Sequence, residues 1–163
     1  MAYRAYIITA SDSGHAGQRE DLSAPAAREL LEAAGYTIAD YVMLPDDRAM
    51  LAEKMREVCD NDLADLLVTT GGTGFSPRDC TPEATADVIE RATPGIPEAM
   101  RYYSLQITPR AMLSRANAGI RKGTLIVNLP GSPKAVKECL EYILPSLKHG
   151  LEILRGDAGN CAR

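Results

Sequence analysis

The chain has 163 residues, of which 45% are hydrophobic and 25% charged, and its formal net charge is −4. These values are typical of one folded domain spanning residues 1–163 and exclude a disordered or fibrous chain, while the negative charge argues against nucleic acid as a partner. The sequence has no apolar run near the roughly 20 residues that span a bilayer, and its start lacks a signal-peptide pattern, so we expect a cytoplasmic protein without a membrane partner.

The first half of the chain alternates between strand and helix patterns. Short apolar runs predict strands at Arg4–Thr9, Thr37–Leu44 and Leu66–Thr70. Helical spacing of small and apolar residues predicts a helix over 21–34 that starts near Ser23 and stops at Gly35. A second helix is expected after Asp47, whose side chain would cap it.

The second half continues the alternation with proline as the main signal. Thr81 as a cap and Pro82 in the first turn predict a helix that runs through Arg91, and another helix is expected after Pro97. A buried strand is expected at Thr124–Leu129. A final helix should begin at Pro133 and be interrupted by Pro145.

Together these elements predict an α/β fold, a three-layer α/β/α sandwich with a mostly parallel central sheet. The uninterrupted apolar run Leu66–Thr70 suggests a strand buried on both faces. Such sheets bind ligands beyond the carboxyl ends of their strands. The loops expected at that edge are Ser11–Gly14, Pro45–Asp47, Gly71–Asp79 and Pro130–Lys134.

A glycine-rich loop follows the third predicted strand, with the sequence Thr70-Gly71-Gly72-Thr73-Gly74. Glycines at this position let backbone N–H groups approach a phosphate closely. The run matches neither the P-loop nor the dinucleotide fingerprint G-x-G-x-x-G, so a tight strand-to-helix turn without a ligand remains an alternative.

Charged residues of both signs lie close to this loop. Arg78 could bind a phosphate, and Asp79 could share one Mg²⁺ with Asp46 from the end of the second strand. The alternatives are a solvated turn for Arg78 and Asp79 and a helix cap for Asp46, although Asp47 is better placed as the cap.

Other residues suggest anion binding more weakly. Ser132 and Lys134 lie at a predicted helix N-terminus, where free N–H groups attract anions, although Ser132 is also explained as a cap. Ser114-Arg115 and Arg121-Lys122 add further cations before the last predicted strand, but basic residues of this kind are usually solvated surface.

Cysteine and histidine form no metal-binding pattern in the sequence. The four cysteines lack a C-x-x-C pair, and we interpret Cys59, Cys80, Cys139 and Cys161 as ordinary thiols. Cys80 lies within the richest motif and would be the candidate if a nucleophile were needed, but no histidine is near it in sequence.

Taken together, the motifs resemble the MogA-type molybdopterin adenylyltransferases, a domain that also occurs in gephyrin and in plant two-domain proteins. The resemblance runs nearly end to end. It is carried by Leu44–Asp46, Thr70–Gly74, Ser76–Thr85, Thr108–Arg115, Ala118–Arg121 and Asn128–Lys134.

The resemblance implies transfer of AMP from Mg²⁺-ATP to the terminal phosphate of molybdopterin, with release of pyrophosphate. Asp46 and Asp79 match the two functional aspartates and would be the catalytic, Mg²⁺-binding residues. Ser114 matches a serine of the pterin-side pocket, and Lys134 or Arg115 would steady a phosphate. The residues expected to bind substrate and nucleotide are Ser11, Asp12, Thr70, Gly71, Gly72, Thr73, Gly74, Arg78, Ser114, Arg115, Asn128, Pro130, Gly131, Ser132 and Lys134.

The family is typically trimeric, so the resemblance also implies a homotrimer that hands its product to a molybdate-insertion protein. Two alternatives remain: a paralogue like the MoaB-type branch, or a scaffold-like protein that binds molybdopterin without efficient adenylylation.

Overall fold

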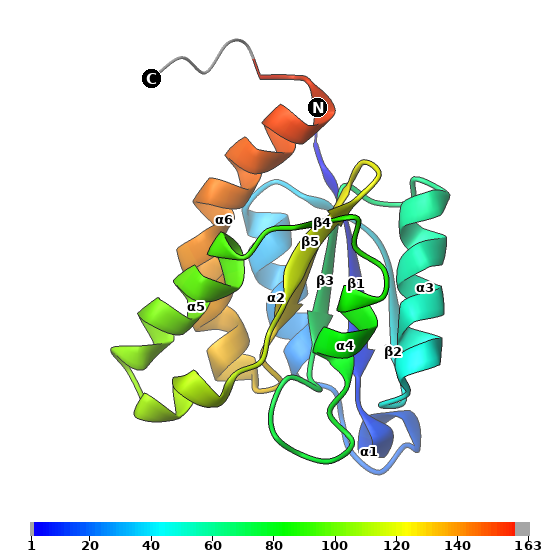
Figure 1. Ribbon diagram of the computed structural model, residues 1–163, viewed down its shortest axis with the longest axis vertical. Helices are drawn as coiled ribbons and strands as arrows, with labels where there is room; N and C mark the ends of the chain where they lie inside the picture. Colours follow the sequence, from blue (N-terminus) through cyan, green and yellow to red (C-terminus); the bar gives the residue numbers. More distant parts are fainter. Residues whose placement is uncertain (1, 159–163) are drawn as a thin grey trace.

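A computed structural model describes residues 2–158 and shows a six-stranded sheet between two layers of helices (Figure 1). The strands are β1 (Arg4–Ala10), β2 (Thr37–Leu44), β3 (Leu66–Thr70), β4 (Arg91–Ala92), β5 (Ala118–Arg121) and β6 (Thr124–Leu129). The helices are α1 (Asp12–His15), α2 (Ser23–Ala33), α3 (Arg48–Asp60), α4 (Thr81–Ala86), α5 (Gly95–Leu105) and α6 (Pro133–Arg155), with a 3-10 helix, η1, at Pro109–Leu113.

The sheet has the strand order β2-β1-β3-β6-β5-β4. Strands β2, β1, β3 and β6 are parallel, whereas β5 is antiparallel to β6 and β4 is antiparallel to β5. The expected α/β fold with a mostly parallel sheet is therefore confirmed.

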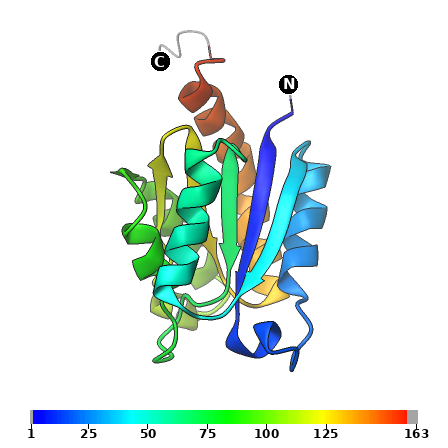
Figure 2. The same cartoon turned by 90° about the vertical axis from the view of Figure 1, so that its right-hand side faces the viewer.

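Both faces of the sheet are covered, as Figure 2 shows from the side. Alternate residues of the strands point to opposite faces. Ile7 of β1 belongs to the core beneath α2, α5 and α6, and its neighbour Ile8 belongs to the core beneath α3 and α4. All of β3 is buried, in agreement with its uninterrupted apolar run.

The structure corrects the helix predicted to run from Thr81 through Arg91. Helix α4 ends at Ala86, and the chain then forms β4, whose flanking amides Glu90 N and Thr93 N donate to carbonyls of β5. Pairing with β5 thus outweighs local helix preference. The cap is also different: Thr81 is the first helical residue, and its own side chain makes no capping hydrogen bond.

The last two helices also differ from the prediction. Helix α5 starts at Gly95, so Pro97 lies in its first turn, where a proline costs no hydrogen bond. Helix α6 continues past Pro145 to Arg155. The proline costs about 3 kcal/mol in a helix interior. Burial of the neighbouring side chains Leu144, Leu147 and Leu151 offsets this, since each contributes about 1.5–3 kcal/mol.

The parallel strands end at one edge of the sheet, where the residue pairs Ala10–Leu44, Thr9–Thr70 and Thr70–Leu129 are in register. The loops after β1, β2, β3 and β6 therefore gather at this edge, the lower end of the molecule in Figure 1. No helix among the described residues is long and apolar enough to cross a membrane.

Candidate active site

A cavity of about 560 Å³ lies at the carboxyl edge of the sheet, within the size range of small-molecule sites. It sits between the loops after β1 and β3, where the chain switches direction across the sheet, as expected for a doubly wound fold. Its lining includes residues of all the predicted loops: Ser11, Asp12, Ser13, Gly14, Asp46, Gly71, Gly72, Ser76, Arg78, Asp79, Gly131, Ser132 and Pro133.

Two glycines shape the wall of this cavity. Gly71 and Gly72 have φ angles of 86° and 70°, which L side chains rarely adopt. A Cβ on Gly71 would lie 2.4 Å from the carbonyl oxygen of Ala10, and one on Gly72 would lie 2.3 Å from Thr81 Oγ1. Only glycine therefore lets the chain after β3 turn this tightly against its neighbours.

Asp12 joins the loops that follow β1, β2 and β3 by hydrogen bonds. Its backbone N–H donates to Asp46 Oδ2 at 3.0 Å, and its own Oδ1 accepts from the Asp46 N–H at 3.0 Å. Its carboxylate also accepts from Arg78 Nε at 2.9 Å and from Nη2 at 3.1 Å. The Arg78 guanidinium, followed by the Asp46 N–H, lowers the pKa of Asp12.

Asp46 has an unsatisfied carboxylate oxygen. Its Oδ1 is buried and has no hydrogen-bond partner among the described residues. Burial raises the pKa of this carboxyl group, and the charges of Asp12 and Asp79 raise it further, against the lowering by the Asp12 N–H and Arg78. A half-buried carboxylate with one buried, unpartnered oxygen and other negative charges nearby is suited to receive a cation.

Asp79 is held by its own loop. Its Oδ2 accepts from the N–H groups of Gly74, at 3.0 Å, and Ser76, at 3.2 Å. Both Asp46 and Asp79 line the large cavity, so the two aspartates that the sequence pairs do meet in one site.

These two carboxylates fit a Mg²⁺ ion that is also bound by substrate phosphates. Within residues 2–158 no three His, Cys, Asp or Glu side chains are grouped to hold a metal ion by themselves. Mg²⁺ is usually held by one or two carboxylates together with substrate phosphates and water, and so does not require such a group. The unpartnered Oδ1 of Asp46 is the atom that such an ion would satisfy.

The opposite wall of the cavity is the start of α6. Ser132 caps this helix by accepting from the Ala135 N–H at 3.2 Å, which confirms its predicted role as a cap. Gly131 is held by Ser23 Oγ, which donates to its carbonyl oxygen at 2.5 Å. The N-terminus of this long helix therefore borders the cavity and favours anions there.

Sequence reasoning missed the segment from Arg19 to Ser23, which also lines the cavity. Asp21 accepts from Thr9 Oγ1 at 2.7 Å and Tyr41 Oη at 2.5 Å, and its Oδ1 caps α2 through the Ser23 and Ala24 N–H groups. Burial raises the pKa of Asp21, but these hydrogen bonds outweigh it and lower the pKa overall. One sequence signal could have indicated this segment: the acidic residue Asp21 lies two residues before Ser23, where α2 begins.

Several predicted residues lie outside the large cavity. Asn128 is buried in the sheet and donates to the hydroxyl groups of Thr69 and Thr85, so it braces the fold behind the site. The Lys134 side chain is 84% exposed and lies 4.0 Å from Glu138. Thr73 is buried beside the cavity, and Gly74 contributes the N–H that binds Asp79.

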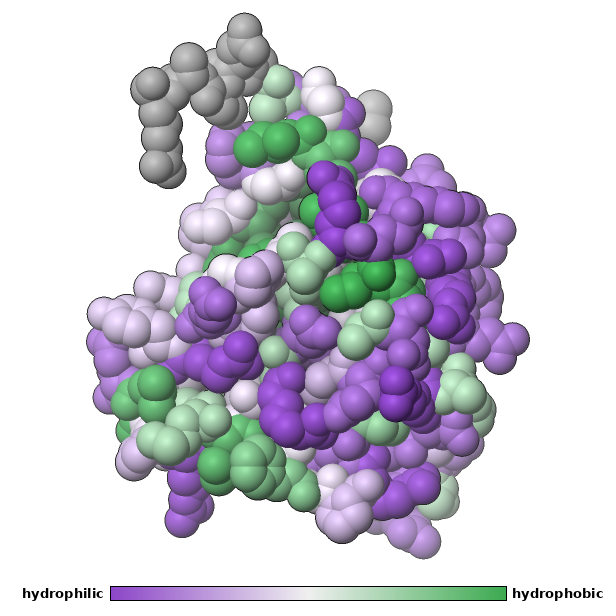
Figure 3. Space-filling model, viewed as in Figure 1, coloured by the Kyte–Doolittle hydropathy of each residue, from purple (hydrophilic) through white to green (hydrophobic). Residues whose placement is uncertain are grey.

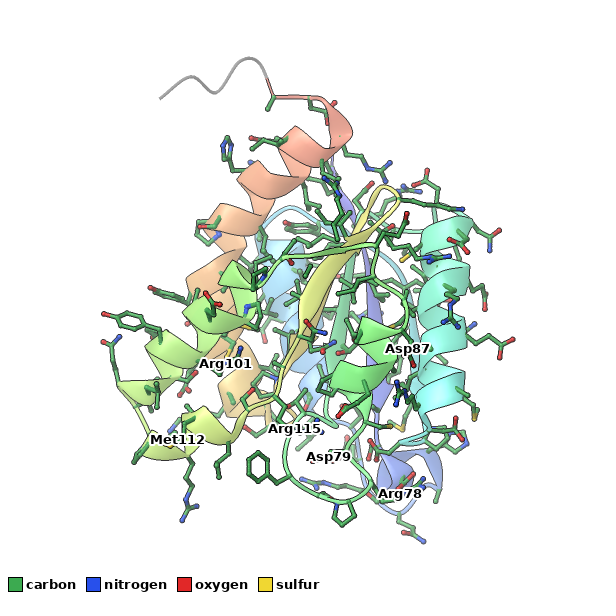
Figure 4. The ribbon with its side chains drawn as sticks, viewed as in Figure 1. Arg78, Asp79, Asp87, Arg101, Met112 and Arg115 are labelled. Atoms are coloured by element: carbon green, nitrogen blue, oxygen red, sulfur yellow. The ribbon has the colours of Figure 1, made fainter. Side chains whose placement is uncertain are left out.

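Arg115 also lies outside the cavity lining, against the outer side of the glycine loop. Its guanidinium donates to the carbonyl oxygens of Gly74 and Asp79 and pairs with Glu83. Figure 4 shows Arg115 directly beside Asp79, with Arg78 on the side facing α1.

A second, more apolar cavity of about 220 Å³ lies between α5, η1 and α6. The predicted residues Ser114 and Pro130 line it, together with Arg101, Thr108 and others. Arg101 Nη1 donates to the carbonyl oxygens of Ser114 and Ala116, which fixes this wall. The surface around η1 is apolar, as the green area at the lower left of Figure 3 shows, and includes the exposed side chains of Leu105, Ile107, Met112 and Leu113.

The cysteines within the described residues are free thiols. Burial raises the pKa of Cys80, and the charges of Asp46 and Glu83 raise it further, so this thiol is poorly suited to act as a nucleophile. Cys161 lies outside the described residues.

Comparison with known proteins gives a consistent result. Residues 6–149 match a family model described as a probable molybdopterin binding domain. The molybdopterin adenylyltransferase of Helicobacter pylori J99 is 41% identical over 93% of this chain and 87% of its own length. The enzyme of that name from Escherichia coli K12 is 41% identical over 84% of this chain and 71% of its own length.

A solved structure of the molybdopterin biosynthesis enzyme MoaB from Thermus thermophilus superposes on this chain with a TM-score of 0.90. The two are 45% identical, and the match covers 94% of this chain and 97% of the other.

Proposed function

The chain belongs to the family of probable molybdopterin-binding domains, and from this premise we propose that it is a molybdopterin adenylyltransferase of molybdenum cofactor biosynthesis. It transfers AMP from ATP to the terminal phosphate of molybdopterin and releases pyrophosphate. The main support for placing the reaction in the large cavity is that Asp46 and Asp79 both line it. The N-terminus of α6, which favours anions, lines the same cavity.

We place ATP and Mg²⁺ in the large cavity. Asp46 Oδ1 and the Asp79 carboxylate would hold the ion, which supplies charge neutralisation on the triphosphate when bound. Backbone N–H groups of the glycine loop would brace phosphate oxygens, and the N-terminus of α6 would favour their charge.

The reaction requires positioning more than acid–base chemistry. An oxygen of the molybdopterin phosphate attacks the α-phosphorus of ATP, the bond from that phosphorus to the oxygen bridging to the β-phosphate breaks, and pyrophosphate leaves. The attacking phosphate is already ionised at neutral pH, so no general base is needed. The protein acts by alignment and by stabilising charge.

We place the pterin end of molybdopterin in the second cavity, against Ser114, as the family resemblance implies. The glycine loop connects the two sites: Gly71 and Gly72 line the large cavity, and Arg115, which follows Ser114 of the second cavity, donates to the Gly74 carbonyl oxygen. Substrate would therefore reach the triphosphate past this loop.

The remaining expectations are part of the same proposal. A homotrimer would give a mass in light scattering close to three times 17.6 kDa. We also propose that the enzyme works in the cytoplasm, where its co-substrate ATP is made, and passes its product to a molybdate-insertion protein.

The metal role has a direct test with a matched control. Asp79→Asn keeps the size of the side chain and removes its charge, so we expect turnover to fall by at least about 100-fold, as when a preorganised charged group is removed from a site. Asp87→Asn makes the same change directly after α4, where Asp87 pairs with Arg48 away from the cavity (Figure 4), and should leave turnover unchanged. Full activity of Asp79→Asn would refute the role of this carboxylate.

A second candidate function is suggested by the 45% identity to the molybdopterin biosynthesis enzyme MoaB of Thermus thermophilus. In this alternative the chain binds molybdopterin without efficient adenylylation. Calorimetry that detects molybdopterin binding while ATP is not consumed would support it over the first.

A further inference from the structure

The loop that carries Asp79 is an exposed arch. Its residues Phe75–Arg78 are all exposed, and the Phe75 side chain is 69% exposed. Inside the arch, the Asp79 carboxylate accepts from the Gly74 and Ser76 N–H groups, and the Asp79 N–H donates to the Ser76 carbonyl oxygen at 2.9 Å. These contacts shape the arch but do not attach it to the rest of the protein.

Arg115 attaches both ends of the arch. Its Nε donates to the Gly74 carbonyl oxygen at 2.7 Å, and its Nη2 donates to the Asp79 carbonyl oxygen at 3.0 Å. Its Nη1 pairs with Glu83 on α4, and its backbone N–H donates to the Thr73 carbonyl oxygen at 2.8 Å. One guanidinium thus closes the base of the arch and joins it to α4.

The backbone that carries Arg115 is itself fixed. Arg101 on α5 donates to the carbonyl oxygens of Ser114 and Ala116, on either side of Arg115. The base of the arch at Gly74 and Asp79 is therefore held through Arg115 by a segment anchored to α5. The exposed Arg78 adds a separate contact from the arch to Asp12.

We propose that Arg115 is a positioning residue that holds the arch closed and so keeps the Asp79 carboxylate in place for the divalent cation. This inference rests on the proposed function. It gives Arg115 a role other than the expected phosphate contact, because Arg115 does not line the large cavity and three of its five guanidinium N–H groups donate to Gly74, Asp79 and Glu83. Groups that orient a metal ligand without touching the metal typically change metal affinity by about 10- to 100-fold when lost.

The test compares Arg115→Lys with Arg121→Lys. Lysine keeps the charge but cannot span two carbonyl oxygens and a carboxylate. Arg121 is a close control, because its guanidinium likewise pairs with a carboxylate, Asp60, and donates to a backbone carbonyl, that of Val88, far from the cavity.

Two properties are measured on the full chain: amide hydrogen exchange of the peptide covering 71–80, and the affinity for Mn²⁺ in the presence of a non-hydrolysable ATP analogue. We expect Arg115→Lys to exchange faster in this peptide than the wild type, and to bind Mn²⁺ about 10-fold or more weakly. Arg121→Lys should change neither. Glu83→Gln keeps Arg115 but removes the charge of one of its partners, so it should shift both properties in the same direction. This variant replaces Arg115→Lys in the test if Arg115→Lys folds poorly.

Unchanged Mn²⁺ affinity in Arg115→Lys would overturn the proposal, even if exchange of the arch became faster, because Arg115 would then have a structural role only. A wild type that binds no Mn²⁺ with the analogue would count against the proposed metal site. In that case unchanged exchange in Arg115→Lys would still refute the closure of the arch.

Discussion

Asp46→Asn should lower activity without lowering stability, because the wild-type carboxylate destabilises the folded protein. Asp46 Oδ1 is buried without a partner, while Oδ2 accepts from the Asp12 N–H. An asparagine oxygen can keep that hydrogen bond, and the neutral amide removes a buried charge near Asp12 and Asp79. Burying a polar group without a hydrogen bond costs about 1–3 kcal/mol in proteins, and burying a charge costs more. The amide NH2 at the Oδ1 position also lacks a partner, so only the part due to the charge is recovered. Recovery of about 1 kcal/mol would raise the melting temperature by about 2–4 °C.

The pH dependence of this gain follows from the raised pKa of Asp46. Above the folded-state pKa the carboxylate is charged in both states, and its destabilising effect is fully present. As pH falls through the folded-state pKa toward the unfolded value, the folded protein takes up a proton more readily, so this effect is relieved. The difference in melting temperature between Asp46→Asn and the wild type should therefore be largest at neutral pH and shrink in acid.

The measurements are calorimetric melting from pH 7 to pH 4 and adenylyl transfer at pH 7. We expect Asp46→Asn to be at least as stable as the wild type at pH 7 and to lose activity. Asp47→Asn is the matched control, because the exposed Asp47 caps α3 through the Met50 N–H and asparagine caps helices equally well. A loss of stability in Asp46→Asn would show that the wild-type carboxylate does not destabilise the fold, and normal activity would refute its role in the reaction.

Two further predictions concern the frame of the site. Gly72→Ala should cost at least about 2 kcal/mol in urea unfolding, since it adds a steric clash to backbone strain, whereas Gly35→Ala, at a φ of 90° but with no heavy atom within 4 Å, should cost about 1 kcal/mol. Equal losses would show that close packing around Gly72 is unimportant. Arg155→Met removes one partner of the buried Asp65 and should cost about 1–3 kcal/mol without changing activity, while Arg28→Met, from an exposed pair, should cost under about 0.5 kcal/mol. A loss below about 0.5 kcal/mol for Arg155→Met would contradict this expectation.

The fold was largely predictable because its central strands are unambiguous. The runs Leu66–Thr70 and Thr124–Leu129 form strands with the predicted bounds, since continuous β-branched and apolar residues suit a buried sheet. The edge strand Thr37–Leu44 also has the predicted bounds, although none of its residues is fully buried. Strands β4 and β5 were missed because they are short and exist through pairing with each other and with β6. The continuity of α6 through Pro145 could not be predicted either, because it depends on burial of its side chains against the rest of the protein, and local sequence preferences do not describe such contacts.

The site was predictable to the extent that topology determines it. Parallel strands bring Asp46 and Asp79 to one edge although they are far apart in sequence, and both line the cavity. The contacts of Asp21 with Thr9 and Tyr41, and of Arg115 with the glycine loop, join distant segments and leave no local pattern. From the sequence, Lys134 or Arg115 was expected to steady a phosphate, and that expectation stays a prediction. The contacts of Arg115 with the glycine loop could not be expected from the sequence.

The most direct test of the proposed adenylyl transfer is to follow the α-phosphate of ATP. The purified chain is incubated with molybdopterin, Mg²⁺ and ATP labelled at the α-phosphorus, and in parallel with ATP labelled at the γ-phosphorus. We expect that the α-label enters molybdopterin, that the γ-label leaves in pyrophosphate, and that both products form in equal amounts. Molybdopterin that binds without acquiring the α-label, under conditions in which the enzyme from Escherichia coli is active, would contradict it.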